Sequence, residues 1–177
     1  MALRWPRRRL SVPPALAAAL QSEEQIQALA PLADGGVLGV SRFGLWLLDG
    51  DVAVRWDWQS VSKASLAGGT LVVIAAQEDA VTPDGIVLLR DLPPREFRFA
   101  GPTGLTDAVH TRVRRSVAAS RHLPWPGAGG WVVLRRVPGR NGLTTQVRLD
   151  PGADADADGF LVAVAQVADQ LRGESAS

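Results

Sequence analysis

The sequence contains no cysteine and only two histidines, His110 and His122, among its 177 residues. The lack of cysteine excludes disulfides, thiol catalysis and cysteine-based zinc sites, and it leaves the redox compartment undecided. No carboxylate or nucleophile stands beside either histidine at a spacing that local structure would bring together, so we expect neither to act as a general base. The sequence therefore predicts a protein that is not an enzyme and that needs no metal and no cofactor.

Lysine is almost absent too, because Lys63 is the only lysine and the other 18 basic residues are arginines. The arginines are spread along the whole chain, which indicates a coding bias rather than selection for phosphate or carboxylate binding. The formal net charge is only +1, but the two ends differ. Residues 1–22 carry four arginines and no acid, whereas residues 150–177 carry six acids and only Arg172.

No stretch approaches the roughly 18 uninterrupted apolar residues that span a bilayer, so we expect no integral membrane protein. Residues 1–22 resemble a secretory signal peptide, yet Pro13 and Pro14 interrupt the apolar stretch that follows the arginines. We interpret this segment as a basic arm followed by a short helix that Pro14 begins. The predicted location is cytoplasmic, and contact of the arm with the membrane surface stays open as an alternative.

From Gln25 onward, short apolar runs alternate with turn residues every eight to twelve positions, a pattern typical of antiparallel β-structure. Turns such as Asp34-Gly35-Gly36 supply residues that tolerate a positive φ. The predicted strands cover residues 26–32, 37–41, 45–48, 52–58, 63–66, 70–75, 86–89 and 96–99, with the last two expected to pair. Trp46, Trp56 and Trp58 lie on these strands, and we expect at least two of them in the core.

The periodicity then changes to that of a helix. Leu105, Val109, Val113 and Val117 form an apolar stripe, which predicts a helix over residues 105–121 with Thr103 as its N-cap. A Pro- and Gly-rich segment leads into a predicted hairpin, residues 131–137 and 143–149, around Asn141-Gly142. A last helix is predicted from Phe160 to Gly173.

Four sequence segments resemble those of the bacterial pleckstrin-homology-like domains. They are Val40–Leu47 (VSRFGLWL), Arg55–Val61 (RWDWQSV), Gly69–Val73 (GTLVV) and Phe97–Phe99 (FRF). The resemblance covers about residues 24 to 121 and implies a bent barrel of about seven strands that a helix caps, without catalytic residues, in a family that mostly binds proteins, peptides or membranes. The loop at Asp34-Gly35-Gly36 lacks the basic residues of lipid-binding relatives, so phosphoinositide binding is not implied.

We therefore expect an α+β fold of mainly antiparallel β-structure in three parts. Residues 1–22 form the basic arm and short helix, and residues 23–122 form the pleckstrin-homology-like barrel with its capping helix. Residues 123–177 form a ββα extension packed on the barrel, because a piece of that size buries too little surface alone, and its tail is disordered from about residue 173.

Two groups of residues are candidates for binding. Arginines of the predicted helix and of the following hairpin could line one basic patch, and Trp125 and Trp131 could lie exposed at an interface or clamp the extension to the barrel. The predicted binding residues are Arg7, Arg8, Arg9, Arg112, Arg115, Trp125 and Trp131. The acidic segment Asp154–Gly159 matches half of a calcium loop, but Ala165 stands where a bidentate glutamate belongs, so we expect no metal there.

The expected function is non-catalytic recognition of a protein partner, which would add a strand to a free barrel edge or pack in a groove beside it. The alternative is a peripheral binder of anionic lipid or nucleic acid that uses the basic arm and the arginine-bearing helix. Nucleic acid is the less favoured partner, because the chain is nearly neutral overall and has no tyrosine for base stacking. The oligomeric state stays open.

Overall fold

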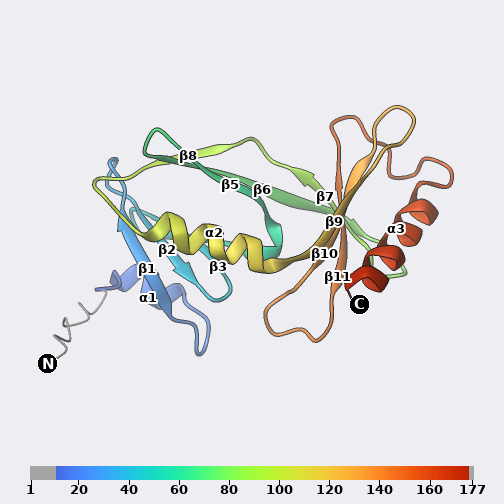
Figure 1. Ribbon diagram of the computed structural model, residues 1–177. Coiled ribbons are helices and arrows are strands. Elements are labelled where there is room, and N and C mark those ends of the chain that lie inside the picture. Colours follow the sequence, from blue (N-terminus) through green and yellow to red (C-terminus); the bar gives the residue numbers. More distant parts are fainter. Residues whose placement is uncertain (1–10, 176–177) are drawn as a thin grey trace, which may run out of the picture.

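The computed structural model describes residues 11–175, so the predicted binding residues Arg7, Arg8 and Arg9 lie outside the described residues. The molecule is elongated and has two lobes (Figure 1). The N-terminal lobe holds the helices and strands of residues 14–75 and 95–116, and the C-terminal lobe holds those of residues 76–91 and 117–175. No helix within residues 11–175 is long and apolar enough to cross a membrane.

An antiparallel meander of four strands begins the N-terminal lobe. Its strands are β1 (Ile26–Pro31), β2 (Val37–Ser41), β3 (Gly44–Asp49) and β4 (Val52–Asp57). The expected glycines turn the chain, since Gly35 and Gly50 both have positive φ. The short helix α1 (Pro14–Ala19) starts at the predicted proline and packs Leu16 against Trp46 and Leu48 on the outer face of this sheet.

A second sheet begins after the 3-10 turn η1 (Trp58–Ser60), with β5 (Val61–Ala67) and the long strand β6 (Thr70–Val81). Strands β7 (Val87–Asp91) and β8 (Arg95–Arg98) lie end to end along β6, so the prediction that they pair with each other is wrong. Pro93 and Pro94 stand between them, and because proline has no N–H to donate, the ladder breaks there.

The two sheets join where β8 meets β1, and together they curl into a half-barrel. The Ala33 N–H donates to the Arg98 carbonyl at 2.9 Å, and the Ala100 N–H donates to the Pro31 carbonyl at 3.0 Å. The inner faces enclose a core of aliphatic residues with Trp58 and Phe97. The fold is thus α+β with mostly antiparallel strands, as predicted.

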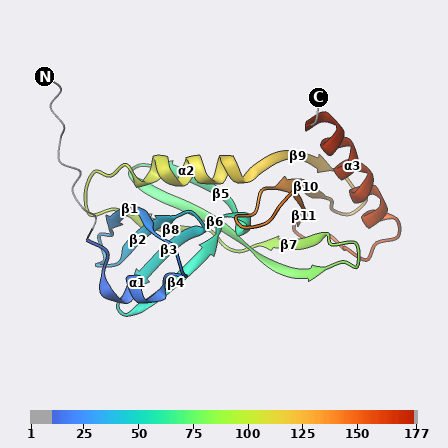
Figure 2. The same ribbon diagram turned by 90° about the horizontal axis from the view of Figure 1, so that it is seen from below.

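Helix α2 (Leu105–Ser116) closes this core with Leu105 and Val109. Its N-cap is Gly104 and not the predicted Thr103, although the Thr103 hydroxyl accepts a hydrogen bond from the Leu105 N–H. The helix ends five residues before the predicted Arg121. Residues 117–123 form β9 (Val117–Leu123) instead, because they pair antiparallel with β10 and extend the C-terminal sheet by one strand. Figure 2 shows α2 leading straight into β9, so one segment spans both lobes.

The predicted hairpin is confirmed as β10 (Gly130–Arg135) and β11 (Thr144–Leu149). The expected ββα extension is larger than predicted, because β9 adds a third strand and β7 pairs with β11 in parallel. Helix α3 (Phe160–Ser175) covers one face of this sheet with Phe160, Val164, Ala168 and Leu171. It continues past Gly173, where the sequence predicted its end, to Ser175.

One buried arginine ties the two lobes together. Arg135 lies at the end of β10, and only 1% of its surface is exposed. Its Nη1 donates to the Ser116 hydroxyl and, at 3.5 Å, to the Trp58 carbonyl, while its Nη2 donates to the Val61 carbonyl at 3.1 Å. Burial, together with the nearby charge of Arg148, lowers the pKa of Arg135 to about 9.

Replacing Arg135 with alanine should lower the free energy of unfolding by about 3 kcal/mol, because the change leaves buried carbonyls without donors and opens a cavity. Urea denaturation followed by tryptophan fluorescence measures this loss. Arg140→Ala is the matched control, since Arg140 is exposed on the adjoining loop, and it should stay within about 0.5 kcal/mol of wild type. An equally small effect of Arg135→Ala would show that Arg135 does not hold the lobes together.

Candidate functional site

Strand β4 borders an open groove. Within residues 11–175, β4 pairs only with β3, so its other edge has no strand partner. A cavity of about 510 Å³ follows this edge, and we call it the β4 groove. Its lining residues are Ala19, Gln21, Trp46, Ala53, Arg55, Trp56, Asp57, Ser60 and Ala76.

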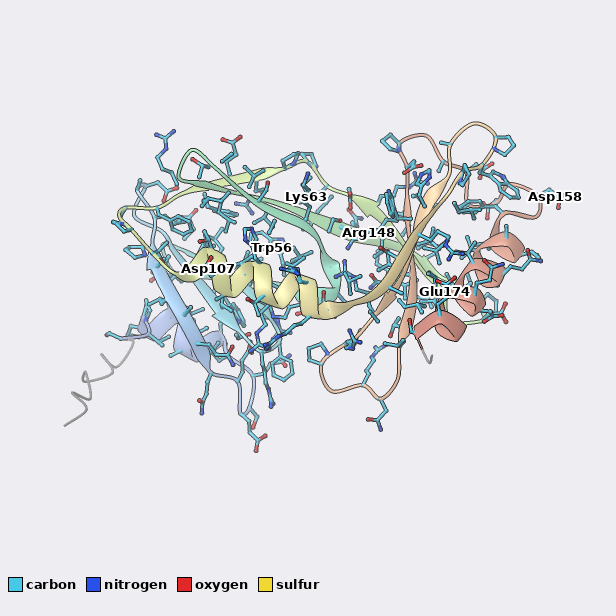
Figure 3. All side chains as sticks on the ribbon, viewed as in Figure 1. Trp56, Lys63, Asp107, Arg148, Asp158 and Glu174 are labelled. Carbon is cyan, nitrogen blue, oxygen red and sulfur yellow. The ribbon has the colours of Figure 1, made fainter. Side chains whose placement is uncertain are left out.

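The two faces of β4 offer different side chains to a ligand at this edge. Val52 and Val54 lie on the face that continues the half-barrel interior, yet they are 65% and 43% exposed. Trp56 on the same face packs against Phe97, and the Arg95 guanidinium lies 5.0 Å from the centre of the Trp56 ring. Figure 3 labels Trp56 within the N-terminal lobe. The edge therefore combines unpaired backbone with exposed apolar surface.

A buried carboxylate fixes the polar wall of the β4 groove. Glu24 Oε1 accepts hydrogen bonds from the Ser41 hydroxyl at 2.5 Å and from Trp46 Nε1 at 2.8 Å. Its Oε2 accepts from Arg55 Nη1 at 3.0 Å and from the Gln21 N–H at 3.1 Å. Because every one of these donors is protonated at neutral pH, the network requires an ionised Glu24.

The pKa of Glu24 lies below its ordinary value. Burial alone would raise the pKa, but the hydrogen bonds from Ser41, Trp46 and the Gln21 N–H and the charge of Arg55 outweigh burial. Sequence reasoning missed Glu24, since a single acid before a strand looks like any solvent-exposed residue. Its partners stand 3 to 31 positions away along the chain.

Four arginines gather at a second site, a smaller cavity of about 180 Å³ between α2 and the end of β10, and we call it the basic pocket. Its lining residues are Arg42, Trp58, Arg112, Arg115, Ser116, Arg136, Val137 and Pro138. The structure thus brings together the predicted residues Arg112 and Arg115 with Arg136 of the following hairpin. Arg42, from the turn between β2 and β3, was not among the predicted residues.

The other arginines of the predicted patch lie elsewhere. Arg121 pairs with Glu174, and Arg114 lies exposed on α2 outside the pocket. Arg135 is buried, and so is Arg148, which pairs with Asp91 and is labelled in Figure 3 near the junction of the lobes. Both extend from the face of the C-terminal sheet that α3 does not cover, because strand residues alternate between faces and Val132, Leu134 and Val147 pack against α3.

The two tryptophans predicted to bind do not line either cavity. Trp125 packs edge-on against Phe160 at 5.5 Å, so it holds α3 within the C-terminal lobe and does not clamp that lobe to the barrel. Trp131 is 47% exposed, and its ring meets His122, which in turn pairs with Asp150. The expectation that at least two strand tryptophans lie in the core is confirmed by Trp46 and Trp58.

A third hollow of about 220 Å³ connects the β4 groove with the basic pocket. It shares Gln21, Arg55 and Asp57 with the groove, and it shares Val137 and Pro138 with the pocket. Phe43, Gln59 and Arg140 complete its lining. One surface track thus runs from the edge of β4, past the loop between β10 and β11, to α2.

Within residues 11–175 no cluster of three His, Asp or Glu residues could hold a metal ion.

Glu24→Gln should lower the free energy of unfolding by about 2 kcal/mol at neutral pH, since it removes the negative charge of the carboxylate that accepts four hydrogen bonds. The lowered pKa means that this stabilisation is complete above the unfolded-state value, near 4.5, and is lost as pH falls through the folded-state value. Urea titrations at several pH values should therefore show the two proteins converging in acid. Glu23→Gln, at an exposed neighbour, is the control. A difference in the free energy of unfolding between wild type and Glu24→Gln that stayed constant across pH would contradict stabilisation by the ionised Glu24.

Comparisons with protein-family models, with curated proteins and with solved structures give no match to this chain.

Proposed function

We propose that this protein is a non-catalytic recognition module that binds an extended segment of a protein partner along β4. The observation that carries the proposal is the unpaired edge of β4 beside a groove of about 510 Å³. An extended peptide would pair its backbone with the free N–H and C=O groups of β4, and this main-chain pairing supplies affinity. Its side chains would alternate between the groove and the exposed Val52 and Val54, and this alternation supplies selectivity.

The remaining sheet edges are less suitable for strand addition. Strand β1 already bonds to the β8 region, and β5 lies against α2 and carries Lys63. Strand β9 carries Arg121 and His122, which pair with Glu174 and Asp150. Charged residues and covering helices are the usual means of protecting an edge from pairing. Strand β4 also carries the ion-paired Arg55 and contacts α1, but it exposes Val52 and Val54 and borders the groove of about 510 Å³, and these two features support it as the docking edge.

The half-barrel supports a pleckstrin-homology-like origin as part of the same proposal. Four strands form the first sheet, β5, β6 and β8 form the facing one, and α2 packs its apolar side over the core between them. The family resemblance implies a scaffold that binds proteins, peptides or membranes. A cytoplasmic location, with contact at the membrane surface as an alternative, belongs to the proposal as well.

The alternative function is peripheral binding of anionic lipid or nucleic acid. Its arginine-rich arm lies outside the described residues, while Arg112 and Arg115 meet in the basic pocket. Loss of liposome flotation when residues 1–12 are deleted would favour the lipid alternative.

Selection of a phage-displayed library of random peptides on the immobilised full chain should enrich segments with alternating apolar residues. Fluorescence anisotropy with a labelled selected peptide then measures affinity. The double variant Val52→Lys/Val54→Lys should weaken binding at least tenfold, because two charges would be desolvated at the docking edge. Amide shifts of β4 in NMR spectra should identify the site.

Val162→Lys is the matched control, because Val162 is 63% exposed on α3, away from the groove. It should bind the peptide as wild type does. Selected peptides that bind the β4 double variant unchanged, or amide shifts that leave β4 unaffected, would refute docking at this edge.

A further inference from the structure

We propose that the basic pocket is a binding site for a phosphate monoester in its dianionic form. The basic pocket shares no lining residue with the β4 groove, so this inference goes beyond the proposed function and stands without it. Its four arginines come from three places in the chain that are distant in sequence. Arg42 lies between β2 and β3, Arg112 and Arg115 lie on α2, and Arg136 follows β10.

The positive charge of the pocket is not neutralised by the protein. Within residues 11–175, none of these four arginines forms an ion pair with a carboxylate, and no acid lines the pocket. Five other arginines of the described chain do form such pairs: Arg55, Arg90, Arg121, Arg148 and Arg172. The chain therefore pairs its arginines in several places and leaves this group without counter-charge.

Neutral partners hold three of the guanidinium groups in place. Arg112 Nη2 donates to the Gln27 side-chain carbonyl, and Arg136 Nη1 donates to the carbonyls of Arg115 and Val117 at 3.4 and 3.3 Å. Arg42 lies over the Phe43 ring, 4.4 Å from its centre. Since a guanidinium has five N–H donors, each group keeps donors for an anion. Burial and the charge of Arg115 lower the pKa of Arg112, which is the electrostatic cost that an anion would relieve.

A fifth positive charge lies behind the pocket wall. The buried Arg135 donates to the Trp58 carbonyl and to the Ser116 hydroxyl, and both of these residues line the pocket. Because its surroundings exclude water, its charge is poorly screened. The potential at the pocket is therefore more positive than its four lining arginines alone would make it.

The size and charge of the site favour a phosphate monoester over a carboxylate. Arginine forks pair two N–H groups with two oxygens of a phosphate, and a dianion has enough oxygens for several forks at once. A single carboxylate would neutralise only one of the clustered charges. Trp58, Val137 and Pro138 supply an apolar wall for the carbon that the ester carries. Both a soluble monoester and the headgroup of a phosphatidate lipid present this chemistry.

Isothermal titration calorimetry with glycerol 2-phosphate at low ionic strength tests the proposal. We expect one site per chain, with affinity at least tenfold lower in Arg112→Gln and in Arg136→Gln, because each change removes charge-assisted hydrogen bonds. Arg114→Gln, an exposed arginine of the same helix outside the pocket, should bind as wild type does. Affinity should also fall as pH drops below about 6, where a phosphate monoester takes up its second proton.

Flotation with vesicles containing phosphatidic acid separates the two sources of the ligand. If the wild-type protein floats with these vesicles and Arg112→Gln and Arg136→Gln abolish flotation, the ligand is the lipid headgroup. If glycerol 2-phosphate binds in calorimetry but the protein does not float, the ligand is a soluble ester. No binding in either assay, or an equal loss in Arg114→Gln, would overturn the proposal. The Val52→Lys/Val54→Lys variant should bind glycerol 2-phosphate normally, so failure of the β4 proposal and failure of this one are distinguishable.

Discussion

The arrangement of the two lobes depends on a buried guanidinium that has no carboxylate beside it. Arg135 extends from the C-terminal sheet and satisfies groups of η1, β5 and the last turn of α2. A guanidinium suits this position because its planar fork donates in several directions at once, whereas an apolar side chain would leave buried carbonyls unpaired. The cost of burying the charge is offset by these bonds and by Asp91, which acts on Arg135 at longer range.

A second buried charge, of opposite sign, organises the other end of the surface track. Glu24 orients Trp46 and Arg55 at the β4 groove, and it accepts a hydrogen bond from Ser41. The Ser41 hydroxyl in turn accepts from the N–H groups of Phe43 and Gly44, and so it shapes the turn that carries Arg42. Glu24 thus supports the β4 groove and, through Ser41, the turn that carries Arg42, whereas Arg135 lies behind the wall of the basic pocket.

Much of the secondary structure was predictable from periodicity, because it reflects which side chains face the core. The meander from β1 to β4, the hairpin of β10 and β11 and helix α3 all appear where the apolar pattern placed them. The predicted helix ended too late, because Val117 continues the helical stripe of Val113 while the backbone of residues 117–123 pairs with β10. Periodicity describes side chains, and it cannot detect a backbone partner that follows later in the chain.

The chain by itself determined the strand-rich class, the turns, the lack of thiol chemistry and the presence of arginines on a helix followed by a hairpin. Only the tertiary structure decided which arginines share a pocket, which edge stays open and which polar residues are buried. The physical reason is distance along the chain. Arg42 and Arg136 line one cavity although 94 residues separate them, and Glu24 meets Arg55 across 31 positions. Such pairings are set by how the sheets curl and pack, and local sequence carries no signal for them.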